Sequence, residues 1–339
     1  MKKFEKTGLY RFHDLSLEVS QEEPVTGVGL LPLLQDLSFV SLQEGEEKTS
    51  LCLSIRMSDQ VVCSPGMARE VFRIDGLCGR EQGNDFYLTE GTSLLHLQVL
   101  KGEAEATLAP SFFQQSPLLQ QRFWGFGLLK LLRPIGLYGL HAAGVVSPMG
   151  LGLLVVGESG CGKSTLAIQL IREGWCYLSD DAVLLRLQPE GVEALAFRKP
   201  FSINTDNDPE YADLPLGGED GPHSSGKKKR RVDIQDAYPE QYVTGCVPQM
   251  VIFPVIIPEL QSTLHPIGRL SALGRLLSQS GPQLFDKRTM PYHLEVLNRL
   301  VSHCQIFELR AGLDLYREPG TFDRLVSEAK ERVHVPDCD

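Results

Sequence analysis

Residues 157–165 have a composition and spacing that predict a phosphate-binding loop. They read G-E-S-G-C-G-K-S-T and match the pattern G-x-x-x-x-G-K-[ST]. This spacing wraps successive backbone N–H groups around phosphate oxygens at the start of a helix. Lys163 is predicted to neutralise the β- and γ-phosphates of ATP, Ser164 to ligate Mg²⁺, and Thr165 to help hold the phosphates. The candidate nucleotide-binding residues are Gly157, Ser159, Gly160, Cys161, Gly162, Lys163, Ser164 and Thr165.

Two adjacent carboxylates follow the loop at a spacing that can return them to it. Asp180 and Asp181 come 17 and 18 residues after Lys163, at the end of a short stretch that predicts a strand. One carboxylate can hold the metal while the other accepts a proton from an attacking hydroxyl. An arbitrary Asp-Asp pair is more often a solvated turn, and the position after the glycine-rich loop favours a catalytic pair. The residues alone leave the two roles unassigned.

Three further features carry less weight. His141 heads the stretch before the loop as a third candidate catalytic residue beside Asp180 and Lys163, although a lone histidine is more often structural. The basic run 227–231 ends in Arg230 and Arg231, which either contact a phosphate or substrate or belong to a solvated loop. Within the loop pattern, Cys161 is expected to be filler rather than a redox switch.

The sequence around these residues predicts an α/β layer. Residues 151–156 form an apolar run typical of a buried strand, and the apolar spacing over 166–171 predicts a helix that ends at Gly174. A strand over 139–146 is predicted before the loop, and the stretch 206–231 is predicted to be a mobile loop. Later strands are predicted at 249–257 and 305–309, and later helices at 270–278, 292–301 and 321–332.

Residues 1–115 predict a smaller β-rich α+β domain. Apolar and polar residues alternate over 51–57 and 95–99, and turn-forming residues separate these runs. A helical pattern over 118–132 then stops at Pro134. We place the boundary just before this helix, which gives an accessory or substrate-docking domain over 1–115 and a P-loop catalytic domain over 116–335.

Composition and charge argue against several classes of protein. The 339 residues exceed what one hydrophobic core usually serves, and 42% hydrophobic with 22% charged residues is ordinary for a folded protein. The net charge of -10 argues against nucleic acid or an anionic membrane as partner. The apolar stretch 123–146 contains Lys130, Arg133 and His141, so a membrane span is not expected. Eight cysteines without a C-x-x-C pair and an N-terminus without an apolar signal segment predict a cytoplasmic protein with reduced thiols.

The order and spacing of the motifs resemble the catalytic domain of HPr kinase/phosphorylase. The resemblance is strong over 141–187, weaker from there to the last helix, and absent before about Ser116. It implies the mixed-sheet nucleotide-binding fold shared with phosphoenolpyruvate carboxykinase and phosphate transfer to a serine hydroxyl. The residues that carry it are Leu140-His141-Ala142-Ala143-Gly144, the loop 157–165, and Gly174 through Leu178-Ser179-Asp180-Asp181.

The resemblance also implies roles for individual residues. Asp180 corresponds to the base toward the acceptor hydroxyl, Asp181 to a Mg²⁺ ligand with Ser164, and His141 to a neighbour on the acceptor side. The two aspartates are interchangeable in this assignment. The family's E-I-R-G-L-G-I-type signature and its usual N-terminal domain are not found, and these departures are similar to those of kinase-only relatives that phosphorylate free serine or a peptide serine.

We therefore predict an ATP-dependent kinase that transfers the γ-phosphate to a serine of a protein or peptide. One alternative is a kinase of free serine or another small hydroxyl metabolite. A second is a P-loop ATPase or switch without a phosphoacceptor, although no L-S-G-G-Q segment follows the loop. A third is a binding module with a degenerate site. The oligomeric state stays open, a homo-oligomer included.

Overall fold

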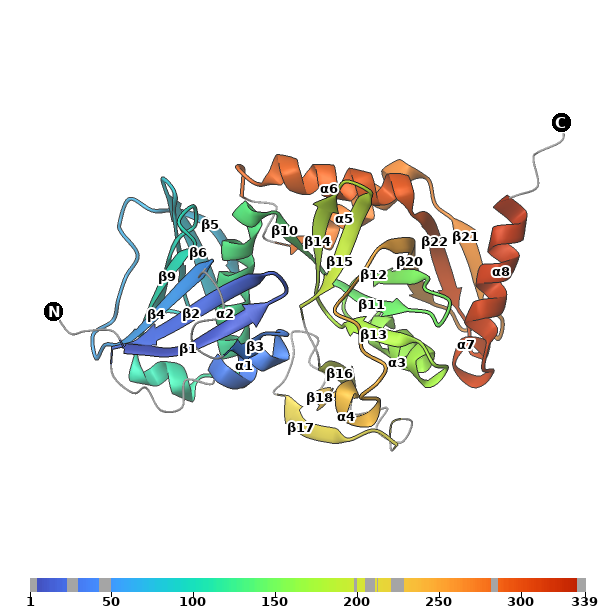
Figure 1. Cartoon of the computed structure of the whole chain (residues 1–339), viewed down its shortest axis with the longest axis horizontal. Coiled ribbons are helices and arrows are strands. Elements are labelled where there is room, and N and C mark those ends of the chain that lie inside the picture. The colour runs from blue at the N-terminus through green and yellow to red at the C-terminus, as the bar shows by residue number, and fades with distance from the viewer. Residues whose placement is uncertain are drawn as a thin grey trace.

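The computed structural model describes residues 5–22, 30–42, 50–197, 200–204, 211, 213–220, 229–281 and 286–333. Within these residues the strands form sheets of nine, four, six and three strands, against which the helices pack (Figure 1). Parallel and antiparallel neighbours occur in the nine- and six-stranded sheets. The expected α/β class with mixed sheets is confirmed.

The first sheet contains the strands up to residue 108 and has the order β3-β1-β2-β4-β9-β8-β7-β6-β5. Helix α1 (Leu30–Asp36) and the 3₁₀ turn η1 (Pro110–Gln114) belong to the same stretch of chain. The strands are β1 (Glu5–Phe12), β2 (Leu15–Gln21), β3 (Val40–Leu42), β4 (Leu51–Met57), β5 (Arg69–Ile74), β6 (Leu77–Gln82), β7 (Asp85–Thr89), β8 (Leu94–Gln98) and β9 (Glu103–Leu108).

Helix α2 (Pro117–Leu132) packs on the first sheet (Figure 1). It begins after Ser116, whose hydroxyl accepts the N–H of Leu119, and a short 3₁₀ turn, η2 (Arg133–Ile135), follows it at Pro134. Its buried Phe123 and Trp124 share a hydrophobic cluster with strands of the first sheet. The boundary before residue 116 stays a prediction, and this helix shares its core with the strands on the N-terminal side of that boundary.

The six-stranded sheet carries the glycine-rich loop and has the order β13-β11-β12-β20-β22-β21. Its strands are β11 (Ala142–Val146), β12 (Gly152–Val156), β13 (Cys176–Ser179), β20 (Pro248–Ile256), β21 (Thr263–Pro266) and β22 (Gln305–Ala311). Along β12 the side chains alternate between two cores, because successive strand residues point to opposite faces. Leu153 and Val155 pack with α3 (Lys163–Arg172) and α8 (Thr321–Val333), whereas Leu154 packs with α5 (Arg269–Ser278) and α6 (Met290–His303).

The single strand predicted over 139–146 is two strands in two sheets. β10 (Leu137–Leu140) pairs with β14 (Val183–Gln188) in the sheet β10-β14-β15-β19, whereas β11 joins the six-stranded sheet. The break falls at His141, whose backbone N–H donates to the carbonyl of Gln279 at 2.9 Å instead of to a strand neighbour. The other strands of this sheet are β15 (Gly191–Ala196) and β19 (Gly245–Cys246).

The stretch 206–231, predicted as one mobile loop, contains strands where it is described. β17 (Leu216–Asp220) and β18 (Lys229–Val232) form a small sheet with β16 (Phe201–Asn204) in the order β16-β18-β17. Buried Phe201 and Val232, which flank the stretch 206–231, anchor this sheet in the cluster around α3, and the polar composition of the stretch itself does not predict this anchoring. Residues 205–210, 212 and 221–228 lie outside the described part. The short helices α4 (Ile234–Ala237) and α7 (Asp314–Arg317) were not predicted.

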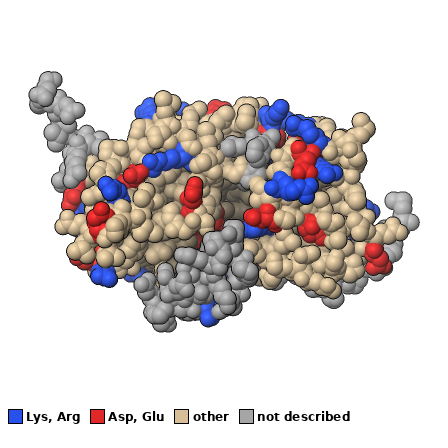
Figure 2. Space-filling model, turned by 180° about the vertical axis from the view of Figure 1, so that it is seen from behind, with Lys and Arg blue, Asp and Glu red and all other residues tan. Residues whose placement is uncertain are grey.

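Basic and acidic side chains are interspersed on the face shown in Figure 2. None of the described helices is both long and apolar enough to cross a bilayer. The cysteines in the described part of the chain are not paired in disulfides.

A buried polar cluster joins the end of α2 to α6. Arg133 is fully buried, donates from Nε to the hydroxyl of Thr289 at 2.7 Å, and lies 3.9 Å from the carboxylate of Asp286. Its second contact is Nδ1 of His293 at 3.2 Å. Burial, with the charge of Arg133, lowers the pKa of His293 to about 3, so this ring is neutral and accepts from the guanidinium.

We expect Arg133→Ala to lower the free energy of unfolding by about 3 kcal/mol, because it leaves buried polar partners without their donor. Arg122→Ala in α2 removes a partly exposed pair with Asp75 and should cost under about 1 kcal/mol. Urea denaturation of both variants measures the difference. Equal losses would show that burial of Arg133 contributes nothing beyond a surface ion pair.

Candidate functional site

The strand order of the six-stranded sheet brings the predicted residues to one edge. β11 lies between β12 and β13 and is antiparallel to both, so β12 and β13 run in the same direction. The carboxyl ends of β12 and β13 therefore flank the start of β11. The loop leaves β12 at Gly157, Asp180 and Asp181 follow β13, and His141 precedes β11. Three segments that lie far apart in the sequence thus meet at one edge.

The glycine-rich loop turns directly from β12 into α3. Gly160 and Gly162 have φ values of +89° and +96°, a left-handed backbone that other residues rarely adopt. A Cβ on Gly157 would lie 2.7 Å from Sγ of Cys161, and one on Gly162 would lie 3.3 Å from the hydroxyl of Tyr316. The glycines are therefore needed for this close loop, which ends at the N-terminus of α3, where helix N–H groups favour an anion.

Lys163 lies at the start of α3 and is 6% exposed. Its ammonium donates to the carbonyls of Gly157 at 2.7 Å and Glu158 at 2.9 Å, and to Nε2 of His141 at 3.1 Å. Carbonyl and imidazole acceptors thus surround the charge on the loop side. Phosphate oxygens are stronger acceptors for such a cation than these neutral groups.

His141 links the lysine to the acidic turn. Its Nδ1 lies 2.7 Å from the carbonyl oxygen of Asp181 and 3.2 Å from a carboxylate oxygen of the same residue. Since Nε2 accepts from Lys163, the neutral ring must carry its proton on Nδ1. One tautomer therefore satisfies both contacts and holds the ring between Lys163 and Asp181.

Asp180 is 1% exposed and accepts a bond from the hydroxyl of Ser164, with oxygen distances of 2.9 and 3.0 Å. Burial raises the pKa of Asp180 from 3.8 to about 6, and the charge of Asp181 adds to this rise. The bond from Ser164 and the charge of Lys163 oppose it. A carboxylate with this pKa exchanges protons near neutral pH, as functional carboxylates often do.

Asp181 occupies a strained backbone position. Its φ is +64°, and the N–H of Ala182 donates to the carbonyl of Asp180 at 2.7 Å, which makes a γ-turn centred on Asp181. Its side chain is 41% exposed, in contrast to that of Asp180. The two neighbouring carboxylates therefore differ in environment, one buried against Ser164 and the other half exposed beside His141.

The donors at this edge fit Mg²⁺. Magnesium prefers oxygen ligands and usually binds through one or two carboxylates, water and substrate phosphates. The hydroxyl of Ser164 and the carboxylate of Asp180 are such oxygens and lie in contact. Within the described residues, no group of three or more His, Cys, Asp or Glu side chains is placed to hold a metal by itself. The set suits a metal that is bound together with phosphates.

Other sequence candidates have different surroundings. Arg231 forms an ion pair with Asp36 of α1, and Arg230 lies beside it in β18, so the assignment of both as phosphate or substrate contacts stays a prediction. Burial raises the pKa of the Cys161 thiol, which disfavours the reactive thiolate. The hydroxyl of Tyr316 also lies near Gly162. The sequence did not single out this tyrosine, because Tyr316 lies far downstream of the loop and no motif surrounds it.

Comparison with known proteins identifies one stretch of the chain. Residues 139–196 match the model of the HPr Serine kinase C-terminal domain. An HPr kinase/phosphorylase from Mycoplasmopsis pulmonis is 51% identical over 41 residues, which are 12% of this chain and 13% of that protein. The corresponding protein of Caldicellulosiruptor bescii is 27% identical over 129 residues, 33% of this chain and 40% of that protein.

The chain is HPr kinase-like in this region, as the sequence motifs predicted. It covers less than two thirds of the length of either relative. The solved HPr(Ser) kinase/phosphatase from Coxiella burnetii is also similar, with a TM-score of 0.29 and 13% identity, covering 57% of this chain and 92% of that one. The match over 139–196 contains His141, the whole loop and both aspartates.

The raised pKa of Asp180 predicts a stability difference that depends on pH. Between pH 3.8 and about 6 the folded protein holds a proton that the unfolded chain releases, so stability falls as pH rises through this window. Above it, the buried charge costs about 3 kcal/mol. Asp180→Asn should therefore gain up to about 3 kcal/mol more over the wild type at pH 8 than at pH 4.

Chemical denaturation at the two pH values measures this gain. The control is Asp59→Asn, which changes an exposed aspartate just after β4. An identical pH dependence in the two variants would mean that Asp180 titrates as a solvated carboxyl group does.

Proposed function

We propose that this chain is an ATP-dependent kinase that transfers the γ-phosphate to a serine hydroxyl of a protein or peptide. The observation that carries the proposal is the contact between the Ser164 hydroxyl and the buried Asp180 carboxylate at the start of α3. Lys163 and the pair His141–Asp181 lie at the same edge of the sheet. The HPr kinase-like match over 139–196 supports the same reaction class.

The loop residues would bind the phosphates, and Lys163 would exchange its two loop carbonyls for β- and γ-phosphate oxygens. Ser164 and Asp180 would hold Mg²⁺, which when bound neutralises charge on the transferred phosphate. Asp181 would accept the proton of the serine hydroxyl, with His141 orienting its carboxylate. This division of roles exchanges the one implied by the family resemblance, because Ser164 contacts Asp180 and because Asp181 is the more exposed carboxylate.

Lys163→Ala should lower phosphate transfer at least 100-fold, because the variant loses the cation that faces the phosphates. Wild type, this variant and the surface control Lys101→Ala are incubated with Mg-ATP and cell extract, and new phosphoserine is located by mass spectrometry. Lys101→Ala should transfer normally. Normal transfer by Lys163→Ala would end the kinase proposal. Transfer to free serine alone would support the small-molecule alternative, and ATP hydrolysis without any acceptor would support the switch.

The roles of the two aspartates predict opposite defects. Asp180→Asn should weaken the Mg²⁺-dependent part of ADP binding at least 10-fold, because it removes a charged metal ligand. Asp181→Asn should leave Mg-ADP affinity within twofold and lower transfer at least 100-fold. Asn also tolerates the left-handed backbone at position 181. Calorimetry and the transfer assay measure the two effects, and the reverse pattern would restore the assignment that the resemblance implies.

A further inference from the structure

A buried hydroxyl spans the acidic turn. Ser179 is fully buried, and its Oγ donates to the carbonyl of Ala182 at 2.5 Å and accepts the N–H of Phe197 at 3.2 Å. The first bond closes the chain around Asp180 and Asp181. The second ties the turn to the residue that follows β15. Ser179 therefore connects the strained backbone around Asp181 to the end of β15.

The first β-hairpin contacts the same strand end. The turn between β1 and β2 contains His13, whose Nε2 donates to the carbonyl of Ala196 at 2.9 Å. The ring of Phe12 packs edge to face on Phe197, with 6.0 Å between centroids. Burial lowers the pKa of His13, so the ring is neutral and donates as a neutral imidazole. The first hairpin thus contacts both Phe197, which donates to Ser179, and the preceding residue Ala196.

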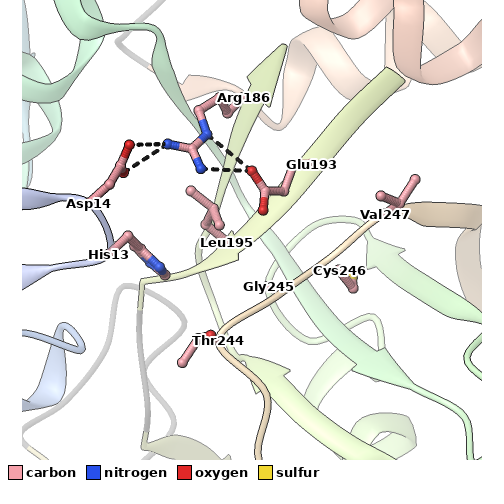
Figure 3. Close-up of a pocket in the computed structure, with 9 residues that line it drawn as sticks. All are labelled: His13, Asp14, Arg186, Glu193, Leu195, Thr244, Gly245, Cys246 and Val247. Atoms are coloured by element: carbon pink, nitrogen blue, oxygen red, sulfur yellow. Dashed lines mark hydrogen bonds and ion pairs between the residues drawn. The ribbon is translucent and has the colours of Figure 1, made fainter. Parts of the chain in front are cut away.

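Ion pairs beside this contact link the β1–β2 turn to β14 and β15. Figure 3 shows the hairpin turn facing β14 and β15. The residues between them line a cavity of about 450 Å³. Arg186 of β14 donates to Asp14 at 2.8 and 2.9 Å and to Glu193 of β15 at 2.8 Å. Leu195 and Phe197 also belong to the hydrophobic cluster of the first sheet. The end of β15 is therefore held by the first sheet through packing and hydrogen bonds together.

We propose that the first sheet positions the acidic turn formed by Asp180 and Asp181. His13 fixes the end of β15 through its bond to Ala196, and Ser179 connects the end of β15 to the backbone of the turn. This inference rests on the proposed function and gives the N-terminal part of the chain a role in it. The left-handed backbone at Asp181 persists only where its surroundings hold it. Without the Ser179 bond the turn relaxes, and a displacement of a catalytic group by about 1 Å can cost about 100-fold in rate.

Hydrogen exchange tests the physical link without any ligand. Ser179→Ala should speed amide exchange at least 10-fold in peptides that cover 180–184 and 194–197, because the Phe197 amide loses its acceptor. His13→Ala should speed exchange in the second peptide about fivefold. The matched controls are Ser147→Ala, which removes another buried turn hydroxyl, and His96→Ala, which removes a stacked histidine of the first sheet. Exchange no faster than in these controls would overturn the proposal.

Kinetics separate positioning from loss of structure. Ser179→Ala and His13→Ala should each lower the kcat of phosphate transfer at least 10-fold and leave the KM for ATP within threefold, and their effects should be non-additive in the double variant. The two controls should keep the wild-type kcat. Faster exchange with unchanged kcat, or additive effects, would refute positioning. If the wild type transfers no phosphate, the proposed function fails, and exchange alone then decides whether the first sheet holds the turn.

Discussion

The hydrogen bond between Ser164 and Asp180 depends on the order of three strands. β12 and β13 run in the same direction with β11 between them, so the loop after β12 and the turn after β13 reach the same edge as the residue before β11. The seryl hydroxyl at the start of α3 can then meet a carboxylate that comes 16 residues later. Without this order, Lys163, His141 and Asp181 would not form one connected set of contacts.

The carboxylate of Asp180 is buried away from water, and this burial determines the energetics of the site. Burial of Asp180 favours its protonated form, and the bond from Ser164, the charge of Lys163 and a backbone hydrogen bond from Asp181 act against that effect. Lys163 is itself held by neutral carbonyls and an imidazole. Groups of this kind interact more strongly with a bound phosphate and metal than they would in water, because the local dielectric constant is low. The same burial that destabilises the unliganded protein therefore strengthens binding.

The first sheet is joined to the site by more than chain connectivity. Its hydrophobic cluster includes Leu184, Leu195 and Phe197 from the far side of the predicted boundary. Ser38 contacts the hydroxyl of Tyr242, and Asp36 pairs with Arg231. An accessory domain with its own separate core would have few such contacts. The helix α2 and the β1–β2 turn instead place the first sheet against β14 and β15, the strands that follow Asp180 and Asp181 in the chain.

The sequence alone determined the local chemistry of the site. The loop 157–165, the strand before it and the helix after it follow from glycine spacing and apolar periodicity, which are local properties, and so does the position of the two aspartates at a strand end. The resemblance to HPr kinase/phosphorylase rested on the same short segments. Tertiary structure decided what lies between those segments. The break at His141, the strands within 206–231, the contact of Asp181 with His141 and the contact of His13 with Ala196 all depend on partners far away in the sequence, and no local pattern encodes such partners.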